Sequence, residues 1–165
     1  MKRKTLFAVV LSLTAVFAFA ESGDLQVTVA GVRDNEGAVR LALYRSDKTF
    51  GKEKKAVTIR EMVAREGEVN VTIRSLPPGR YAILAYHDRN GNRKFDRRLG
   101  LVDAEGHGLS NNPGRDAGHS FETAAFDFAG GTGAAVRIDL NYCHPGPADE
   151  RSLGRSLRCW VTLSD

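Results

Sequence analysis

Alternation of apolar and polar residues with a period of two most constrains the fold of this chain. The alternating apolar residues are Leu25, Val27 and Val29; Val39, Leu41 and Leu43; Val69, Val71 and Ile73; and Val136, Ile138 and Leu140. Successive side chains of a β-strand point to opposite faces, so each segment is predicted to be a half-buried strand. A shorter alternating segment at 57–60 predicts one more strand.

Turn residues separate these segments. Asp34-Asn35-Glu36-Gly37, Arg65-Glu66-Gly67 and Pro77-Pro78-Gly79 are typical of tight turns, because Gly accepts positive φ and Pro fixes φ. No long amphipathic helix is evident, and only residues 48–55 are expected to hold a helical turn. The pattern predicts an all-β fold: a single immunoglobulin- or transthyretin-like antiparallel β-sandwich of about seven strands with one long loop.

Residues 81–87 depart from the alternation. Their sequence, Tyr-Ala-Ile-Leu-Ala-Tyr-His, is apolar on both faces. A strand of this composition is expected at the centre of a sheet, where both of its faces are covered.

The first twenty residues resemble a secretory signal. A basic start is followed by an apolar run from Leu6 to Phe19 and by Ala18-Phe19-Ala20. The run is shorter than the ~20 residues needed to cross a bilayer core, so an uncleaved anchor is the weaker interpretation. We expect a signal peptide at 1–20, a sandwich domain at 21–142 and a C-terminal tail at 143–165. The mature protein would be periplasmic or secreted, with no membrane span.

The charge of the chain does not favour a nucleic-acid partner. The whole chain carries 24 Lys and Arg against 20 Asp and Glu, a formal charge of +4. Three of the basic residues lie in the expected signal, which has no acid, so 21 minus 20 leaves +1 for the mature chain. A hydrophobic fraction of 42% and a charged fraction of 27% also exclude a disordered or multi-span membrane protein.

Two cysteines, Cys143 and Cys159, lie in the tail. Export would place them in an oxidising compartment, where a disulfide between them would persist. Two free thiols are the alternative. The tail lacks the further ligands of a four-cysteine or two-cysteine, two-histidine zinc site.

Residues 88–120 contain no clear strand pattern, and a segment of this length is usually functional or disordered. It begins with oxygen-bearing side chains at alternate positions: Asp88, Asn90 and Asn92, followed by Asp96. An EF-hand calcium loop uses this spacing, with a backbone carbonyl at its seventh position, which is Lys94 here. The candidate calcium ligands are therefore Asp88, Asn90, Asn92, the Lys94 carbonyl and Asp96.

The loop also departs from the EF-hand pattern. Arg93 replaces the Gly of the sixth position, and Leu99 replaces the Glu of the twelfth. Asp103 or Glu105 could supply a late carboxylate by folding back. The alternative is a metal-free loop in which these Asp and Asn residues form Asx-turns.

Several short motifs resemble one bacterial family. They are Leu76-Pro77-Pro78-Gly79-Arg80-Tyr81-Ala82, His87-Asp88-Arg89-Asn90-Gly91-Asn92, Leu99-Gly100, and Glu105-Gly106-His107-Gly108-Leu109-Ser110-Asn111-Asn112. In this order, between Asp24 and Tyr142, they resemble the bacterial domain-of-unknown-function family numbered 2141. The resemblance implies an exported β-sandwich, in which Arg93 stands where the family commonly has Gly. The Pro-Pro-Gly-x-Tyr segment also resembles transthyretin-like and carboxypeptidase-regulatory-like sandwiches, which implies a structural role for Tyr81.

Three functional hypotheses remain open. The first is a noncatalytic exported module, structural or binding an unknown envelope or extracellular ligand through residues 88–120. The second is a calcium-stabilised domain that binds glycan or envelope material. The third is a metal-dependent enzyme that uses His87, His107 and His119; its alternative is that His87 bonds the loop while His107 and His119 are solvated. We expect no catalytic residues, and no cofactor except calcium in the second hypothesis.

Overall fold

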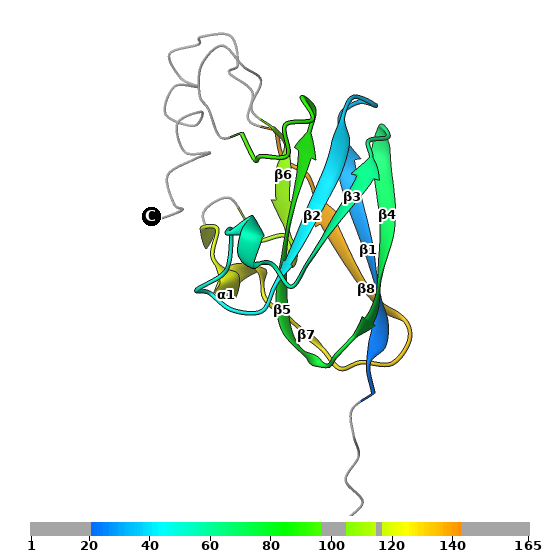
Figure 1. Cartoon of the computed structure of the whole chain (residues 1–165), viewed down its shortest axis with the longest axis vertical. Helices are drawn as coiled ribbons and strands as arrows, with labels where there is room; N and C mark the ends of the chain where they lie inside the picture. The colour runs from blue at the N-terminus through cyan, green and yellow to red at the C-terminus, as the bar shows by residue number, and fades with distance from the viewer. Residues whose placement is uncertain (1–20, 97–104, 115–116, 143–165) are drawn as a thin grey trace, which may run out of the picture.

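The computed structural model describes residues 21–96, 105–114 and 117–142, which form a sandwich of two β-sheets (Figure 1). One sheet has the strand order β4-β1-β8, formed by β1 (Gly23–Val32), β4 (Gly67–Leu76) and β8 (Ala134–Asp139). The second sheet has the order β3-β2-β5-β6, formed by β2 (Ala38–Tyr44), β3 (Thr58–Val63), β5 (Gly79–Asp88) and β6 (His107–Leu109). A short strand, β7 (Phe126–Phe128), pairs with the beginning of β5. Two single turns of helix complete the fold: η1 (Glu53–Lys55) and α1 (Phe121–Ala124).

The predicted β-sandwich is confirmed, including the central position of β5 between β2 and β6. Two details of the prediction were wrong. β1 pairs with β8 in parallel, so the strands are not all antiparallel. The segment 88–120 also contains a strand, β6, which pairs with β5. The parallel pair is allowed because a long stretch of chain separates β1 from β8 and can carry β8 back to the end at which β1 begins.

The main core lies between the two sheets. Every second side chain of β1 points inward: Leu25, Val27 and Val29 are buried, while the residues between them are exposed or half-buried. They pack against inward residues of β2 and β5, such as Leu41 and Ile83. Burial of such side chains contributes about 25 cal/mol per Å² of apolar surface removed from water, which explains why the period of two specifies these strands.

A smaller core covers the outer face of the second sheet. Ala82 and Leu84 of β5 point outward and pack with Leu109, Phe121 and other residues of this cluster. Both faces of β5 are therefore covered, as its composition predicts, and all residues from Tyr81 to Asp88 are buried. The covering helix α1 has only four residues, too few for a helical period to be visible in the sequence.

Hydrogen bonds attach α1 and the segment after β6 to the outer face of the second sheet. The Ser110 hydroxyl is fully buried; it accepts a hydrogen bond from Ile83 N–H at 2.8 Å and donates one to the Ala124 carbonyl at 2.5 Å. Ser120 caps α1, because its hydroxyl accepts from Thr123 N–H at 3.2 Å. The structural role expected for Tyr81 is seen here as well, since its buried side chain donates to the Pro77 carbonyl at 2.9 Å.

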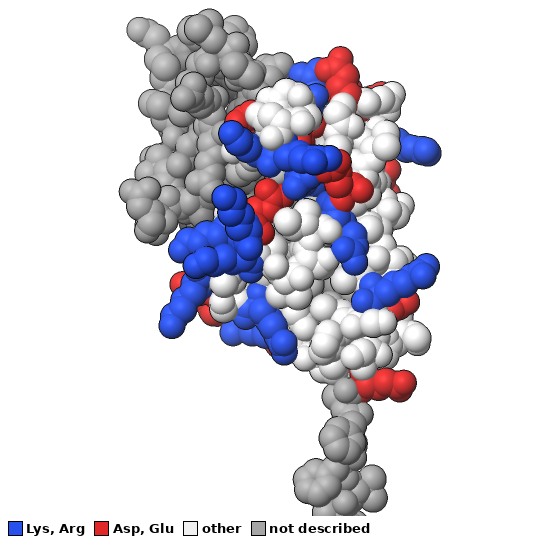
Figure 2. All heavy atoms as spheres, in the orientation of Figure 1, with Lys and Arg blue, Asp and Glu red and all other residues white. Residues whose placement is uncertain are grey.

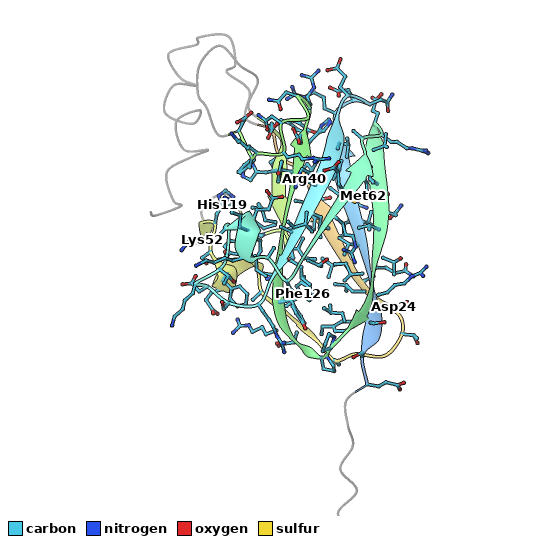
Figure 3. The ribbon with its side chains drawn as sticks, in the orientation of Figure 1. Asp24, Arg40, Lys52, Met62, His119 and Phe126 are labelled. Carbon is cyan, nitrogen blue, oxygen red and sulfur yellow. The ribbon has the colours of Figure 1, made fainter. Side chains whose placement is uncertain are left out.

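Charged side chains of both signs are spread over the visible face of the molecule (Figure 2). Lys and Arg side chains gather near η1, in the region where Figure 3 labels Lys52. Among the described residues, no helix has the length and apolar character that crossing a membrane requires.

Candidate polar site at the end of strand β5

Two adjacent polar residues, His87 and Asp88, end β5 and are both buried. Because side chains alternate along a strand, they occupy opposite faces of the second sheet. His87 points into the space between the sheets, while Asp88 lies on the outer face with Tyr86. The hairpin between β1 and β2 and the loop after β5 meet at this end of the sandwich, the upper end in Figure 1.

The inward side is a closed hydrogen-bond network around His87. Its Nε2 lies 2.7 Å from the Glu36 carbonyl oxygen, and its Nδ1 lies 2.8 Å from the Tyr142 hydroxyl. A carbonyl can only accept, so we assign the ring proton to Nε2. The Tyr142 hydroxyl accepts from Arg33 N–H at 3.0 Å and has its own proton available for Nδ1. Both ring nitrogens of His87 therefore have a hydrogen-bond partner.

Close backbone approach makes this network possible. A Cβ at Gly106 would lie 2.3 Å from ring atoms of Tyr142, so only glycine leaves room for the tyrosine. Gly37 has φ of +70°, and a Cβ there would lie 2.1 Å from the Asp88 carbonyl oxygen. The Arg33 guanidinium covers the Tyr142 ring at 4.2 Å from its centroid, a cation–π contact.

The outward side is the loop predicted to hold calcium. Asp88 accepts two backbone N–H groups, from Asn92 at 3.1 Å and from Arg93 at 2.8 Å. The side-chain amides of Asn90 and Asn92 both donate to Asp96 Oδ2, at 2.9 Å and 2.7 Å. Asn90, Asn92 and Asp96 form a hydrogen-bonded ring, and Asp88 is joined to it through Asn92 N–H, so four of the five predicted ligands are connected.

The fifth predicted residue, Lys94, is exposed and joins the ring through its backbone N–H, which donates to Asn92 Oδ1 at 2.8 Å. Asn90 Oδ1 likewise accepts from Asn92 N–H at 3.0 Å. Each of these two bonds closes an Asx-turn between a side chain and the backbone two residues later. The loop therefore contains the turns of the metal-free interpretation together with the side-chain cluster of the calcium interpretation.

Glu105 is the late carboxylate that reaches this loop, whereas Asp103 and Leu99 lie outside the described residues. Its Oε2 accepts from Asp96 N–H at 2.9 Å. Its other oxygen, Oε1, is buried and has no hydrogen-bond partner among residues 21–96, 105–114 and 117–142; Glu105 is 4% exposed. Burial, together with the negative charges of Asp88 and Asp96, raises the pKa of Glu105 to about 7, although its bond from Asp96 N–H opposes the rise.

The basic residues of the loop point to other acids. Arg89 pairs with Asp34 at 3.0 Å and with Glu36 at 2.6 Å, both on the β1–β2 hairpin. Arg93 lies 3.4 Å from Glu61 of β3. Arg89 and Arg93 thus form ion pairs with acids that lie outside the loop.

Aromatic side chains attach the loop to the outer face of the sheet. Phe95 lies between Tyr86 and His107, with ring centroids at 5.4 Å and 4.9 Å. His107 is buried and contacts His119, whose ring centroid is 4.9 Å away. His107 is therefore not solvated, contrary to the expectation from sequence, because pairing with Tyr86 places it under Phe95.

The three histidines do not gather as the enzyme hypothesis requires. His107 shares the outer face with Tyr86, whereas His87 lies on the inner face. Within residues 21–96, 105–114 and 117–142, no group of three or more His, Cys, Asp or Glu is close enough to hold a metal ion. The ring around Asp96 combines carboxylates with amides and is thus, at most, a partly assembled cation site.

A second buried charge, Arg40 of β2, lies on the outer face beside Tyr86 (Figure 3). It donates to the Tyr86 hydroxyl at 2.9 Å, to Glu53 at 2.6 Å, and to Glu61. Burial, followed by the charge of Glu53, raises the pKa of Tyr86 to about 12, despite the opposing effect of Arg40. The network fixes η1 and β3 to β2, and the local sequence gave no signal for it.

Sequence reasoning also missed the partners of His87. Tyr142 and the hairpin residue Glu36 are far from His87 in the chain, and only the pairing of strands brings them together. The proposed disulfide between Cys143 and Cys159 and the expected signal peptide at 1–20 lie outside the described residues.

Comparison with known proteins gives a family but no activity. Among solved structures, one match is titled "Crystal structure of a putative adhesin from Bacteroides ovatus"; it has 15% sequence identity and a TM-score of 0.35, and the match covers 83% of this chain. The chain spans 50% of the length of that protein. The curated proteins give no match. A family model described as "Uncharacterized protein conserved in bacteria (DUF2141)" matches residues 27–135, more than half of the chain, so the protein belongs to the DUF2141 family.

Proposed function

We propose that the protein is an exported, noncatalytic β-sandwich module that binds an envelope or extracellular ligand through residues 88–120. The observation that carries this proposal is the use of reactive side chains to hold the fold. His87 is fully buried, and both of its ring nitrogens are engaged in hydrogen bonds. The Ser110 hydroxyl is equally buried and bonds both β5 and α1.

The loop after β5 offers a polar surface for such a ligand. Asn90, Asn92, Arg93 and Lys94 are exposed at the same end of the sandwich. Buried contacts of Asp88 and Phe95 hold the loop in place, so binding would not require the whole loop to become ordered.

Export is supported by the signal pattern at residues 1–20. Cell fractionation followed by mass determination of the protein tests it. We expect a protein that begins at Glu21, in the periplasm or in the medium. Intact protein in the cytoplasm would contradict export.

Binding is tested by co-sedimentation of the mature chain with purified peptidoglycan and by affinity electrophoresis in soluble polysaccharides. We expect an Arg93→Ala Lys94→Ala variant to bind at least about tenfold more weakly than wild type. The matched control is Arg65→Ala Arg74→Ala, which removes two exposed cations that do not belong to the loop. Equal binding by both variants would contradict the loop as the binding surface, and turnover of a probe that is lost in His87→Gln would contradict a noncatalytic role.

A second candidate is a calcium-stabilised domain that binds glycan or envelope material. The ring of Asp88, Asn90, Asn92 and Asp96 favours it, because oxygen ligands on a tight loop suit calcium. The test is thermal melting in calcium, in zinc and in chelator. We expect calcium to raise the melting temperature of wild type. No rise, or an equal rise in an Asp88→Ala Asp96→Ala variant, would reject this candidate.

A further inference from the structure

Lysine is concentrated in one short segment of the chain. Of the seven lysines, two lie in the expected signal peptide, one is Lys94, and the other four are Lys48, Lys52, Lys54 and Lys55. These four, which we call the η1 lysines, are all exposed on the connection between β2 and β3. Figure 2 shows Lys and Arg side chains gathered around this connection.

The acids near the η1 lysines offset their charge only in part. Residues 48–55 contain one acid, Glu53, and its carboxylate lies 2.6 Å from the guanidinium of the buried Arg40. Arg40 therefore balances the charge of Glu53. The next acid, Asp47, is exposed and precedes the segment. Four lysines against one such acid leave a local excess of positive charge, which attracts polyanions.

The segment that carries these lysines is anchored to the outer face of the second sheet. The Phe50 ring packs against Tyr44 and Phe121, with ring centroids at 5.3 Å and 6.3 Å. Phe50 N–H donates to the Ser46 carbonyl at 3.1 Å. The backbone of the segment is thus held in place before any ligand arrives, which lowers the entropy cost of binding.

Exposed aliphatic side chains lie on the same part of the molecule. Within residues 21–96, 105–114 and 117–142, the exposed large hydrophobic residues are Val57, Ile59 and Val63, at 50%, 38% and 74%. Val57 follows η1 closely in the chain. Ile59 pairs with Ala42 of β2, which belongs to the outer core, so Ile59 also faces outward. Lysines beside exposed aliphatic side chains suit the interface of an anionic membrane.

The residue types favour a membrane over a single phosphate group or a polysaccharide chain. Lysine is a point charge on a flexible stem and lacks the planar fork with which arginine binds one phosphate in a bidentate manner. The aromatic ring of the segment, Phe50, packs inward and gives no surface on which a ligand ring could stack. A bilayer presents many headgroups over an extended surface, which separate flexible charges can contact together.

We propose that the η1 lysines, together with Val57 and Ile59, form a surface that docks on membranes containing anionic phospholipid. The lysines contact headgroup phosphates, and the two aliphatic side chains reach the boundary between headgroups and acyl chains. The inference goes beyond the proposed function, because none of these residues belongs to segment 88–120. It gives the module a reversible peripheral attachment to a membrane.

The test is co-sedimentation of the mature chain with two kinds of vesicle: phosphatidylcholine alone, and equimolar phosphatidylcholine and phosphatidylglycerol. We expect binding to the anionic vesicles only, and weaker binding as salt rises, because salt screens exposed charges. Lys54→Gln Lys55→Gln should weaken binding at least about tenfold, since each lysine near an anionic surface contributes about fivefold. The control Arg65→Gln Arg74→Gln removes the same charge from exposed positions outside the segment and should bind as wild type does.

A second pair of variants tests the apolar part of the surface. Val57→Ser should weaken binding to the anionic vesicles about threefold, because less apolar surface leaves water. Val63→Ser is the matched control, since Val63 is also exposed but ends β3, about 20 Å further along the strand. Equal weakening by the two variants would overturn the role of Val57.

Three results would overturn the membrane surface itself. The first is no binding of wild type to the anionic vesicles. The second is equal weakening by Lys54→Gln Lys55→Gln and its arginine control, which would show that net charge alone attracts the protein. The third is binding to immobilised dextran sulfate without binding to vesicles, which would identify a polysaccharide surface. Thermal melting checks the fold, and the exposed substitutions should leave the melting temperature unchanged.

Discussion

The two faces of β5 carry contrasting polar clusters at the same end of the sandwich. On the inner face, His87 has a partner for each ring nitrogen and is sealed by Tyr142. On the outer face, the charges of Asp88 and Asp96 act on Glu105, and one oxygen of Glu105 has no hydrogen-bond partner within the part of the chain that the structure describes. The difference teaches that buried polar groups act in two ways: a network with all its hydrogen bonds made stabilises the fold, whereas a buried carboxylate with an unpaired oxygen costs stability when it is ionised.

The largest expected loss of stability comes from breaking the His87 network on the inner face of β5. His87→Leu keeps much of the volume but leaves the Tyr142 hydroxyl and the Glu36 carbonyl without their buried partner. We expect a loss of about 3 kcal/mol in the free energy of unfolding. Urea denaturation measures it. Tyr142→Phe is the milder control, and a loss below that of Tyr142→Phe would show that the His87 network is not structural.

The next effect concerns the room made for Tyr142. Gly106→Ala places a methyl group against the tyrosine ring, so we expect a loss of about 2 kcal/mol. Because the cost arises from one contact, Gly106→Ala should be much less harmful when combined with Tyr142→Leu. A double-mutant cycle in urea measures this coupling, and additive losses would contradict the steric explanation.

On the outer face, ionisation of Glu105 should make the metal-free protein less stable as pH rises. The folded pKa of Glu105 is about 7, above its ordinary value of 4.5, so the folded state retains this proton over a range where the unfolded chain releases it. Stability contributed by the bound proton is present below pH 4.5 and is lost progressively up to about pH 7. In chelator, wild type should therefore lose about 2 kcal/mol relative to Glu105→Gln across this window.

Chemical denaturation of both proteins in parallel at several pH values measures the difference. A constant gap between wild type and Glu105→Gln would show that Glu105 is not perturbed.

The smallest expected effect on stability concerns Asp34 of the β1–β2 hairpin. Burial would raise the pKa of Asp34, but its bond from Glu36 N–H and the charge of Arg89 outweigh burial and hold that pKa below the ordinary value. Its contribution is thus present above pH 3.8 and is lost as pH falls through the folded pKa. Because the Asp34 side chain is partly exposed and solvent screens its charge, we expect Asp34→Asn to cost only about 0.5 kcal/mol at pH 7. The cost should vanish in acid, and urea melts at pH 7 and pH 3 check it.

Much of the fold could be predicted from local sequence. Alternation located β1, β2, β4 and β8, and the doubly apolar segment located β5 at the centre of its sheet. Short elements escaped, since β6 and β7 have three residues each and α1 has four. Elements of that length are set by their neighbours and not by a period of their own.

The candidate site divides in the same way. The spacing of Asp88, Asn90, Asn92 and Asp96 was visible in the sequence, because a tight loop brings alternate side chains together locally. The role of Glu105 could only be raised as one of two options, since residues 97–104 separate it from the loop. The partners of His87 gave no local signal.

The sequence by itself determined the sandwich, the central strand and the oxygen-rich loop, because periodicity and turn chemistry act between residues close in the chain. Only the tertiary structure decided that His87 and Asp88 face opposite environments, that Tyr142 closes one of them, and that Glu105 is buried beside the other. The physical reason is register: pairing β5 with β6 and with the β1–β2 hairpin determines which distant side chains share a face, and short-range propensity carries no information about that choice.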